Sequence, residues 1–476
     1  MTFFSLNHAE NLRMVNERLR VDASFDLLTK RLTVAGRQAT FFCIDGFIKD
    51  EMFEKMLEYL SKLTPQQVKQ AKTADDFSDL FITYIEAGTE ADLDRFATFV
   101  LSGAIGMVLE GYDKAIVIDP RTYPARSVEE PESDRLLRGA HDGFVETVIF
   151  NTALIRRRIR NPQLTMQLFQ IGNRSKTDVV VCYLADAVDA KQLATLEKRL
   201  AAIDVSALPM CQESLRECLV PSQPWNPFPR FRYTERPDTA AACIYEGNII
   251  VLVDGSPSAM ILPTGAFDFA QDINDYYFPP LIGSFLRCIR ILVFTVSFLF
   301  TPTWYVLLLH QSAMPEWMQF IFVGEPNGVP IYFQLIVTEF MIDCLRLASL
   351  NTPNALSTSF SVIGALVLGD FGVRSGIFVP EVVLFMAFTA IANFAQPSFE
   401  LGFSIKYSRM LILTLTALFD FWGYAAGMLL VLLVFCFTKT LGGYTYLYPL
   451  FPLNKEALRG VFLRRSIRQR RKSERR

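Results

Sequence analysis

An uneven distribution of charge along the chain limits what it can fold into. Residues 291–438 contain only twelve Asp, Glu, Lys or Arg residues in 148 positions, whereas residues 1–290 contain 71 of them. A segment so poor in charge cannot form the surface of a water-soluble domain, and apolar runs of about 20 residues are typical of membrane-spanning helices. The sequence therefore predicts a water-facing region followed by a membrane domain.

The last residues form a strongly basic tail. Residues 459–476 carry nine Lys or Arg residues and one Glu, a net charge of +8, although the whole chain has a net charge of −2. Beside a membrane, such a tail is typical of a cytoplasmic anchor on anionic lipid. We favour lipid over nucleic acid as its partner, because the tail lacks interleaved aromatic residues and follows apolar spans.

The sequence lacks the motifs of common catalytic and metal sites. Its three histidines are far apart, its eight cysteines include no CxxC pair, and no P-loop, GxSxG or HExxH motif occurs. We therefore expect no metal, no cofactor and no enzymatic activity.

Strand and helix patterns alternate twice in the first 290 residues. In each round, a strand candidate is followed by an amphipathic helix and then by a β-hairpin. The two rounds comprise residues 39–44, 52–60 and 105–118, and residues 179–184, 190–200 and 249–262. The predicted fold class is an α/β cytoplasmic region of two duplicated α/β subdomains, followed by an α-helical polytopic membrane domain.

A charged segment with three prolines separates the two rounds. It begins near Pro120 and leads into a predicted helix over 143–159, whose last turn contains three arginines that complement a helix C-terminus. The segment fits either a docking surface for a neighbouring subunit or phospholipid, or a solvated linker. The expected domains are 1–122 and 161–285 (α/β subdomains), 123–160 (linker and helix), 286–440 (membrane) and 441–476 (tail).

The membrane domain is expected to contain four spans and one short re-entrant segment. The spans are predicted at 291–309, 329–350, 376–396 and 410–437, and the re-entrant segment at 355–369. Arg287 and Arg290 precede the first span as snorkelling bases, so the positive-inside rule places the N-terminal region in the cytoplasm. A cytoplasmic tail then requires an even number of crossings, which leaves Lys406 and Arg409 in an outside loop.

Three ionisable residues share one face of the second predicted span. Glu339, Asp343 and Arg346 lie at i, i+4 and i+7. Ionisable groups in a bilayer face a water-filled path or one another. They therefore form either the lining of a pore or gate, or a buried ion pair of Arg346 with one of the acids. Further pore or gating candidates are Asp370, Glu381 and Asp420.

The linker and the helix after it carry long motifs. YPARSVEEPE at 123–132 and RGAHDGFVE at 138–146, followed by RRRI at 156–159, resemble the signature of the GerA family of spore germination proteins. The signature residues to which the resemblance assigns subunit docking are Arg126, Glu129, Glu130, Pro131, Arg138, Gly139, Asp142, Gly143, Phe144, Glu146, Asn151 and Arg157.

Within the family, GAHDG at 139–143 differs from the pattern of germinant-receptor A subunits and resembles an accessory branch. This resemblance implies a multi-pass protein of the inner spore membrane, with both its N-terminal region and its tail on the core side. It implies a homo-oligomer that acts with other spore membrane germination proteins as a cation-releasing channel and amplifies germination. The alternatives are a receptor A subunit that senses nutrients with B and C partners, and a secondary transporter or membrane scaffold.

Overall fold

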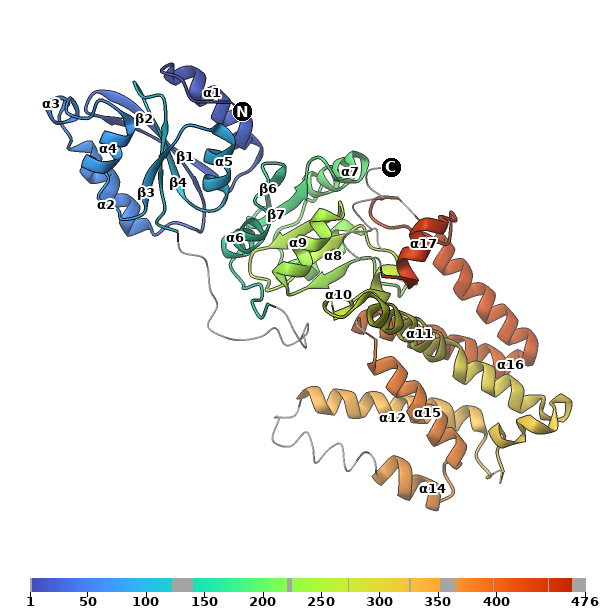
Figure 1. Cartoon of the computed structure of the whole chain (residues 1–476). Helices are drawn as coiled ribbons and strands as arrows, with labels where there is room; N and C mark the ends of the chain where they lie inside the picture. Colours follow the sequence, from blue (N-terminus) through green and yellow to red (C-terminus); the bar gives the residue numbers. More distant parts are fainter. Residues whose placement is uncertain are drawn as a thin grey trace. The chain divides into compact units, whose positions relative to one another are not determined.

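A computed structural model describes residues 2–121, 140–220, 225–272, 274–324, 327–351, 364, 366–396, 398–443 and 445–464. The chain forms two compact units (Figure 1). The first, called here the α/β unit, comprises Met1–Ser222 and Phe231–Thr264. The second, the helical unit, comprises Gln223–Arg230 and Gly265–Arg476.

The α/β unit contains two five-stranded sheets with the same strand order. The first sheet has the order β1-β2-β4-β5-β3 and the second β6-β7-β9-β10-β8, and all neighbouring strands are antiparallel. Their bounds are β1 Leu27–Val34, β2 Arg37–Ile44, β3 Ala87–Glu90, β4 Ile105–Leu109, β5 Ala115–Ile118, β6 Leu164–Ile171, β7 Thr177–Leu184, β8 Arg232–Thr234, β9 Ile249–Val253 and β10 Ala259–Leu262. This equivalence confirms the predicted repeat of two α/β subdomains.

Helices cover both faces of the first sheet. Successive side chains of β2 point to opposite faces, and the apolar ones are buried on both. Phe41 packs with Phe77 of α4 in one core, and Phe42 packs with Phe96 of α5 in another. The helices of the α/β unit are α1 His8–Leu19, α2 Asp50–Ser61, α3 Pro65–Val68, α4 Ala74–Phe81, α5 Leu93–Leu101, α6 Val148–Arg158, α7 Ala190–Ala201, α8 Gln212–Leu219 and α9 Pro237–Tyr245.

A buried ion pair joins the two halves of the α/β unit. Arg156, in the last turn of α6, donates to both carboxylate oxygens of Asp26 at 2.8 and 2.9 Å, and both side chains are at most 1% exposed. Ser24 accepts a further bond from the same guanidinium at 3.1 Å. The arginines of this last turn were expected to interact with the carbonyl groups at the helix C-terminus. Arg158 does so, because it donates to the carbonyl of Leu154 at 3.1 Å.

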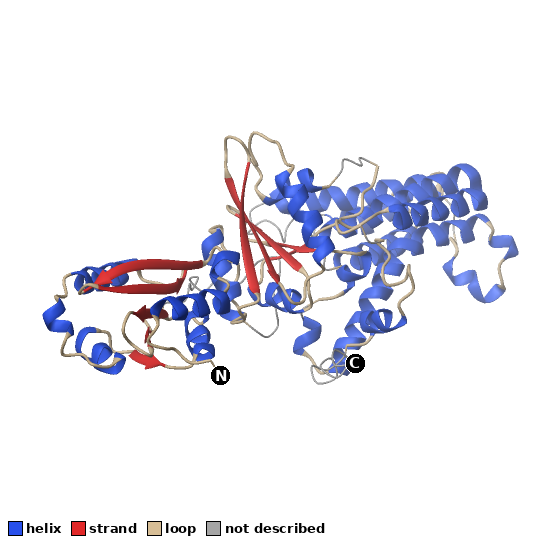
Figure 2. Ribbon diagram, turned by 90° about the horizontal axis from the view of Figure 1, so that it is seen from above, coloured by secondary structure: helices blue, strands red, loops and turns tan. Residues whose placement is uncertain are grey.

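The helical unit has no strand arrows in its described part (Figure 2). Its helices are α10 Asn274–Tyr277, α11 Pro280–Leu309, α12 Ile331–Asn351, α14 Gly372–Arg374, α15 Pro380–Phe394, α16 Phe399–Phe437 and α17 Lys455–Phe462. Among the described residues, two helices, α11 and α16, are long and apolar enough to cross a membrane. Four spans remain a prediction, since α12 carries three ionisable residues and α15 has only 15 residues. Most of the predicted re-entrant segment, 355–369, lies outside the described residues.

The helix α16 reverses direction at Asp420, whose φ of 55° and ψ of −137° are not helical. A Cβ placed on Gly427 would lie 3.1 Å from the Cα of Ile412. In a straight helix these two residues would be about 22 Å apart. We conclude that α16 forms two antiparallel arms, residues 399–419 and 421–437. The span predicted at 410–437 therefore contains a reversal of direction that was not predicted, because an apolar run gives no sign of a one-residue change of backbone conformation.

The GxxxG motif of Gly423 and Gly427 lets the two arms approach closely. A Cβ on Gly423 would overlap the carbonyl oxygen of Leu415, whereas a Cβ on Gly460 in α17 meets nothing within 4 Å. Gly423 thus has no room for a side chain unless the arms separate.

The start of α11 and the segment before the tail lie together at one end of the helical unit, here called the basal end. Arg287 of α11 donates to Asp275 at 3.0 Å and to the carbonyl of Gly460 in α17 at 2.8 Å. Arg287 is 2% exposed and Asp275 is fully buried. The prediction that Arg287 snorkels is therefore wrong, because a nearby carboxylate neutralises it inside the protein.

We predict that Gly423→Ala lowers the free energy of unfolding by about 1–3 kcal/mol, because the added methyl group overpacks the contact between the arms. The measurement is thermal unfolding of the full chain in detergent, followed by tryptophan fluorescence, since Trp422 adjoins the turn. Gly460→Ala, inside α17, is the matched control and should not lower stability, because the added methyl group meets no atom and Ala favours the helix more than Gly does. Equal stability of both variants would contradict the hairpin packing.

Candidate functional site

Acidic and basic residues of two helices meet inside the helical unit. Glu339 and Asp343 lie one turn apart on α12, so they share a face. Lys406 and Arg409 lie on the first arm of α16, which begins after Ser398, whose hydroxyl accepts from the amide of Leu401 at 3.3 Å.

Three helices contribute to the resulting network. Arg409 donates to Oε1 of Glu339 at 2.7 Å and to the carbonyl of Ser297 on α11 at 2.6 Å. The Nζ atom of Lys406 lies 3.2 Å from the same Glu339 oxygen and also contacts Asp343. We call Glu339, Asp343, Lys406 and Arg409 the charge network.

Burial differs across the charge network. The side chains of Glu339, Lys406 and Arg409 are 8%, 7% and 3% exposed, whereas that of Asp343 is 33% exposed. Two acids and two bases cancel in formal charge, which makes their burial among apolar helices tolerable. Asp343 is therefore the member of the network that another molecule or an ion can reach.

Two expectations about this region are wrong. Lys406 and Arg409 lie buried within α16 and not in an outside loop, because the helix starts at Phe399. Arg346 is also not the partner of the acids: its guanidinium lies 5.0 Å from the ring centre of Phe399 and 4.5 Å from that of Phe403. Cation–π contacts of Arg346 thus exclude the ion pair with an acid that was one of the two alternatives for these residues.

The remaining pore or gating candidates lie at separate positions in the described part of the unit. Asp370 pairs with Arg374 at 2.7 Å on an exposed turn. Glu381, in the first turn of α15, accepts from the amide of Gly324 at 3.2 Å. Asp420, at the turn of α16, lies 3.6 Å from the imidazole of His310. Among the described residues, no hydrogen bond or ion pair joins these three acids to the charge network, so the six candidates do not form one site.

Half of the predicted signature residues can be placed. Arg126, Glu129, Glu130, Pro131, Arg138 and Gly139 lie outside the described residues. Of the other six, Asp142 accepts a hydrogen bond from Arg158 at 2.5 Å. Gly143, Phe144 and Asn151 are buried. Glu146 and Arg157 are exposed. The side-chain amide of Asn151 accepts a hydrogen bond from the N–H of Val145 at 2.8 Å and donates one to the carbonyl of Val145 at 2.5 Å. It therefore fixes the segment that leads into α6.

The described residues contain no group of three His, Cys, Asp or Glu side chains that could hold a metal ion. Burial raises the pKa of the Cys43 thiol to about 12, and burial also raises the pKa of Cys182. Both thiols are therefore protonated and unreactive near neutral pH.

Sequence reasoning missed the two bases of the charge network. A signal was present: Ser398 is an N-cap residue type, and Glu400 lies in the first turn after it. Extending the last apolar run back to this cap would have placed Lys406 and Arg409 inside the helix.

An α/β unit followed by two helices long and apolar enough to cross a membrane is consistent with a membrane-associated protein. The family model described as Bacillus/Clostridium GerA spore germination protein matches residues 13–475. The chain therefore belongs to the GerA family of spore germination proteins, as the sequence motifs predicted.

Two relatives by sequence agree with this assignment. The chain is 35% identical to stage V sporulation protein AF of Bacillus subtilis (strain 168) over 458 residues, which covers 96% of this chain and 92% of that protein. It is 28% identical to spore germination protein GerLA of Bacillus cereus over 446 residues, covering 92% of this chain and 89% of that protein. The crystal structure of the N-terminal domain of the A subunit of the Bacillus megaterium spore germinant receptor GerK3 matches 55% of this chain and 96% of that domain, with a TM-score of 0.42 and 22% identity.

We predict that Glu339→Gln lowers the free energy of unfolding by about 3–5 kcal/mol, because it leaves two buried bases short of a carboxylate. Asp370→Asn is the control: its partner is exposed, so the loss should be about 1 kcal/mol or less. Thermal unfolding of the full chain in detergent measures both. A loss for Glu339→Gln no greater than for the control would show that the network does not hold the helices together.

Proposed function

We propose that this protein is a subunit of an oligomeric ion channel in the inner spore membrane, which releases cations and amplifies the germination response. The observation that carries the proposal is the partly exposed carboxylate of Asp343, which belongs to a charge-neutral network that is otherwise buried among apolar helices. Membership of the GerA family supports the role in germination.

The two acids of the charge network have different roles in this proposal. Glu339 is enclosed and shared by Lys406 and Arg409, so it serves to hold α12 against α16. Asp343 contacts only Lys406 in the network and keeps a third of its side chain open. A carboxylate at the edge of a pore favours cations, so Asp343 is the residue that we assign to cation passage.

The exposed face of α12 supports oligomerisation. Phe333, Val337, Phe340 and Leu347 are 57%, 43%, 67% and 58% exposed, and their spacing places them along one seam of the helix. Such a seam suits packing against a neighbouring subunit in the membrane. Asp343 lies on the same helix, so copies arranged around an axis would bring several of these carboxylates near one path.

The basal end supports the proposed orientation. α17, which precedes the basic tail, contacts the start of α11 through Arg287. α17 and the polypeptide that enters the first apolar helix therefore lie at the same end of the helical unit. A cytoplasmic, core-side position for both, with the tail on anionic lipid, is consistent with the positive-inside rule.

We predict that Asp343→Asn lowers the potassium conductance of the purified full chain in planar bilayers by about tenfold, because it leaves the charge network with a net charge of +1, which repels cations at that point. The same variant should slow potassium release from germinating spores. Glu316→Gln, which neutralises an exposed acid in the segment after α11, is the matched control and should conduct like the unmodified protein.

Conductance unchanged by Asp343→Asn would refute the assignment of this residue. A folded, membrane-inserted chain that never conducts would favour a scaffold. Ion release that requires a nutrient, together with B and C partners, would favour a receptor A subunit.

A further inference from the structure

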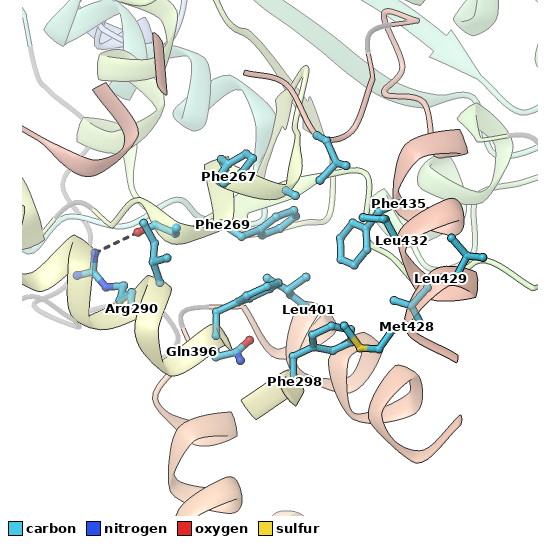
Figure 3. A pocket seen from close by; sticks show the side chains of 16 residues that line it. Phe267, Phe269, Arg290, Phe298, Gln396, Leu401, Met428, Leu429, Leu432 and Phe435 are labelled. Carbon is cyan, nitrogen blue, oxygen red and sulfur yellow. Dashed lines mark hydrogen bonds between the residues drawn. The ribbon is translucent and has the colours of Figure 1, made fainter. Parts of the chain in front are cut away.

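An apolar cavity of about 490 Å³ lies at the basal end of the helical unit (Figure 3). Its walls come from α11, both arms of α16 and the segment before α10, with Phe269, Phe298 and Phe435 among the lining side chains. This volume lies within the range of about 300–1,000 Å³ that ligand sites in proteins occupy. The cavity is separate from the charge network, whose residues do not line it.

The cavity is bordered on one side by exposed residues of the second arm of α16. Leu429 and Leu432 line it and are 57% and 54% exposed, whereas Val431 and Phe435 line it and are 3% and 9% exposed. Because the mouth is formed by exposed leucines and the interior by buried apolar residues, a hydrocarbon chain can enter sideways from the bilayer without crossing polar surface.

One polar side chain in the wall has no partner. Both Nε2 and Oε1 of Gln396 are buried, and neither makes a hydrogen bond. The other polar lining residue, Arg290, is already engaged, with Asp275 at 2.8 Å and the carbonyl of Ala270 at 3.4 Å. A buried amide without partners costs free energy, so the ligand that suits this cavity brings its own hydrogen-bonding group to Gln396.

We propose that the cavity binds one acyl chain of a membrane glycerophospholipid, with the ester carbonyl of the lipid accepting a hydrogen bond from Nε2 of Gln396. The position of Gln396 along the helical unit suits an ester carbonyl, because Gln396 and Arg290 lie at the basal end. In the proposed orientation, that end is where the helices reach the lipid interface. The inference rests on the membrane placement under Proposed function, but not on ion conduction.

The test uses the full chain in phosphatidylglycerol vesicles that contain a trace of phosphatidylglycerol with a photoactivatable diazirine in its acyl chain. After irradiation, labelled peptides are mapped by mass spectrometry. We expect labelling concentrated on cavity-lining positions of α11 and of the second arm of α16. Labelling spread evenly over exposed apolar residues outside the cavity, such as Phe388 and Ile391 of α15, would overturn the proposal and indicate bulk lipid contact only.

Variants at the mouth provide matched controls. Leu432→Trp should reduce labelling of the cavity wall by about fivefold, whereas Leu433→Trp, at a neighbouring residue that is 45% exposed but does not line the cavity, should not. Leu429→Trp and Leu430→Trp form a second such pair if either first variant is unstable. Equal labelling within both pairs would refute entry at this mouth.

The role of Gln396 is tested with ester-linked and ether-linked probes. The unmodified protein should retain the ester probe about fivefold better, since only that lipid supplies a carbonyl, and Gln396→Leu should lose this preference. Equal retention of both probes by the unmodified protein would overturn the assignment of the amide. Labelling is measured without any measurement of ion flux, so a failure of lipid binding can be told apart from a failure of the channel. Carbonate extraction of the vesicles tests whether the protein is inserted, so a failure of lipid binding can also be told apart from a failure of membrane placement.

Discussion

The helical unit depends on neutralising charge that its apolar helices bury. Glu339 of α12 is shared by Lys406 and Arg409 of α16, and Arg409 also bonds the backbone of α11 at Ser297. An unpaired charge in such surroundings would be strongly unfavourable, so these contacts determine which faces of the three helices meet. The pairing also leaves Asp343 at the open edge of the network, where it is available for another role.

A second constraint is the reversal of α16 at Asp420. The close approach of Gly427 to Ile412 brings the second arm back along the first, towards the basal end. This return places Val431 and Phe435 beside Leu401 and Phe269, which together bound the apolar cavity. The hairpin therefore creates both the compact bundle and the space proposed for an acyl chain, while the charge network lies outside that space.

Local pattern was enough for much of the α/β unit. The hairpin strands β4, β5, β9 and β10 match the predicted segments, because buried strands have apolar runs bounded by turn residues. The pairing of Arg156 with Asp26 was not predictable, since 130 residues separate them and a helix C-terminus explained the arginine equally well. The pairing of Glu339 with Arg409 was also not predictable, because 70 residues separate them.

The sequence by itself determined the family, the repeat in the α/β unit, the apolar character of the helical unit and the shared face of Glu339 and Asp343. Each of these follows from composition, from spacing or from a contiguous motif. Only the tertiary structure decided which bases neutralise those acids, where α16 turns and what Gln396 faces. These features depend on contacts between distant segments and on one backbone conformation, which periodicity along the chain does not encode.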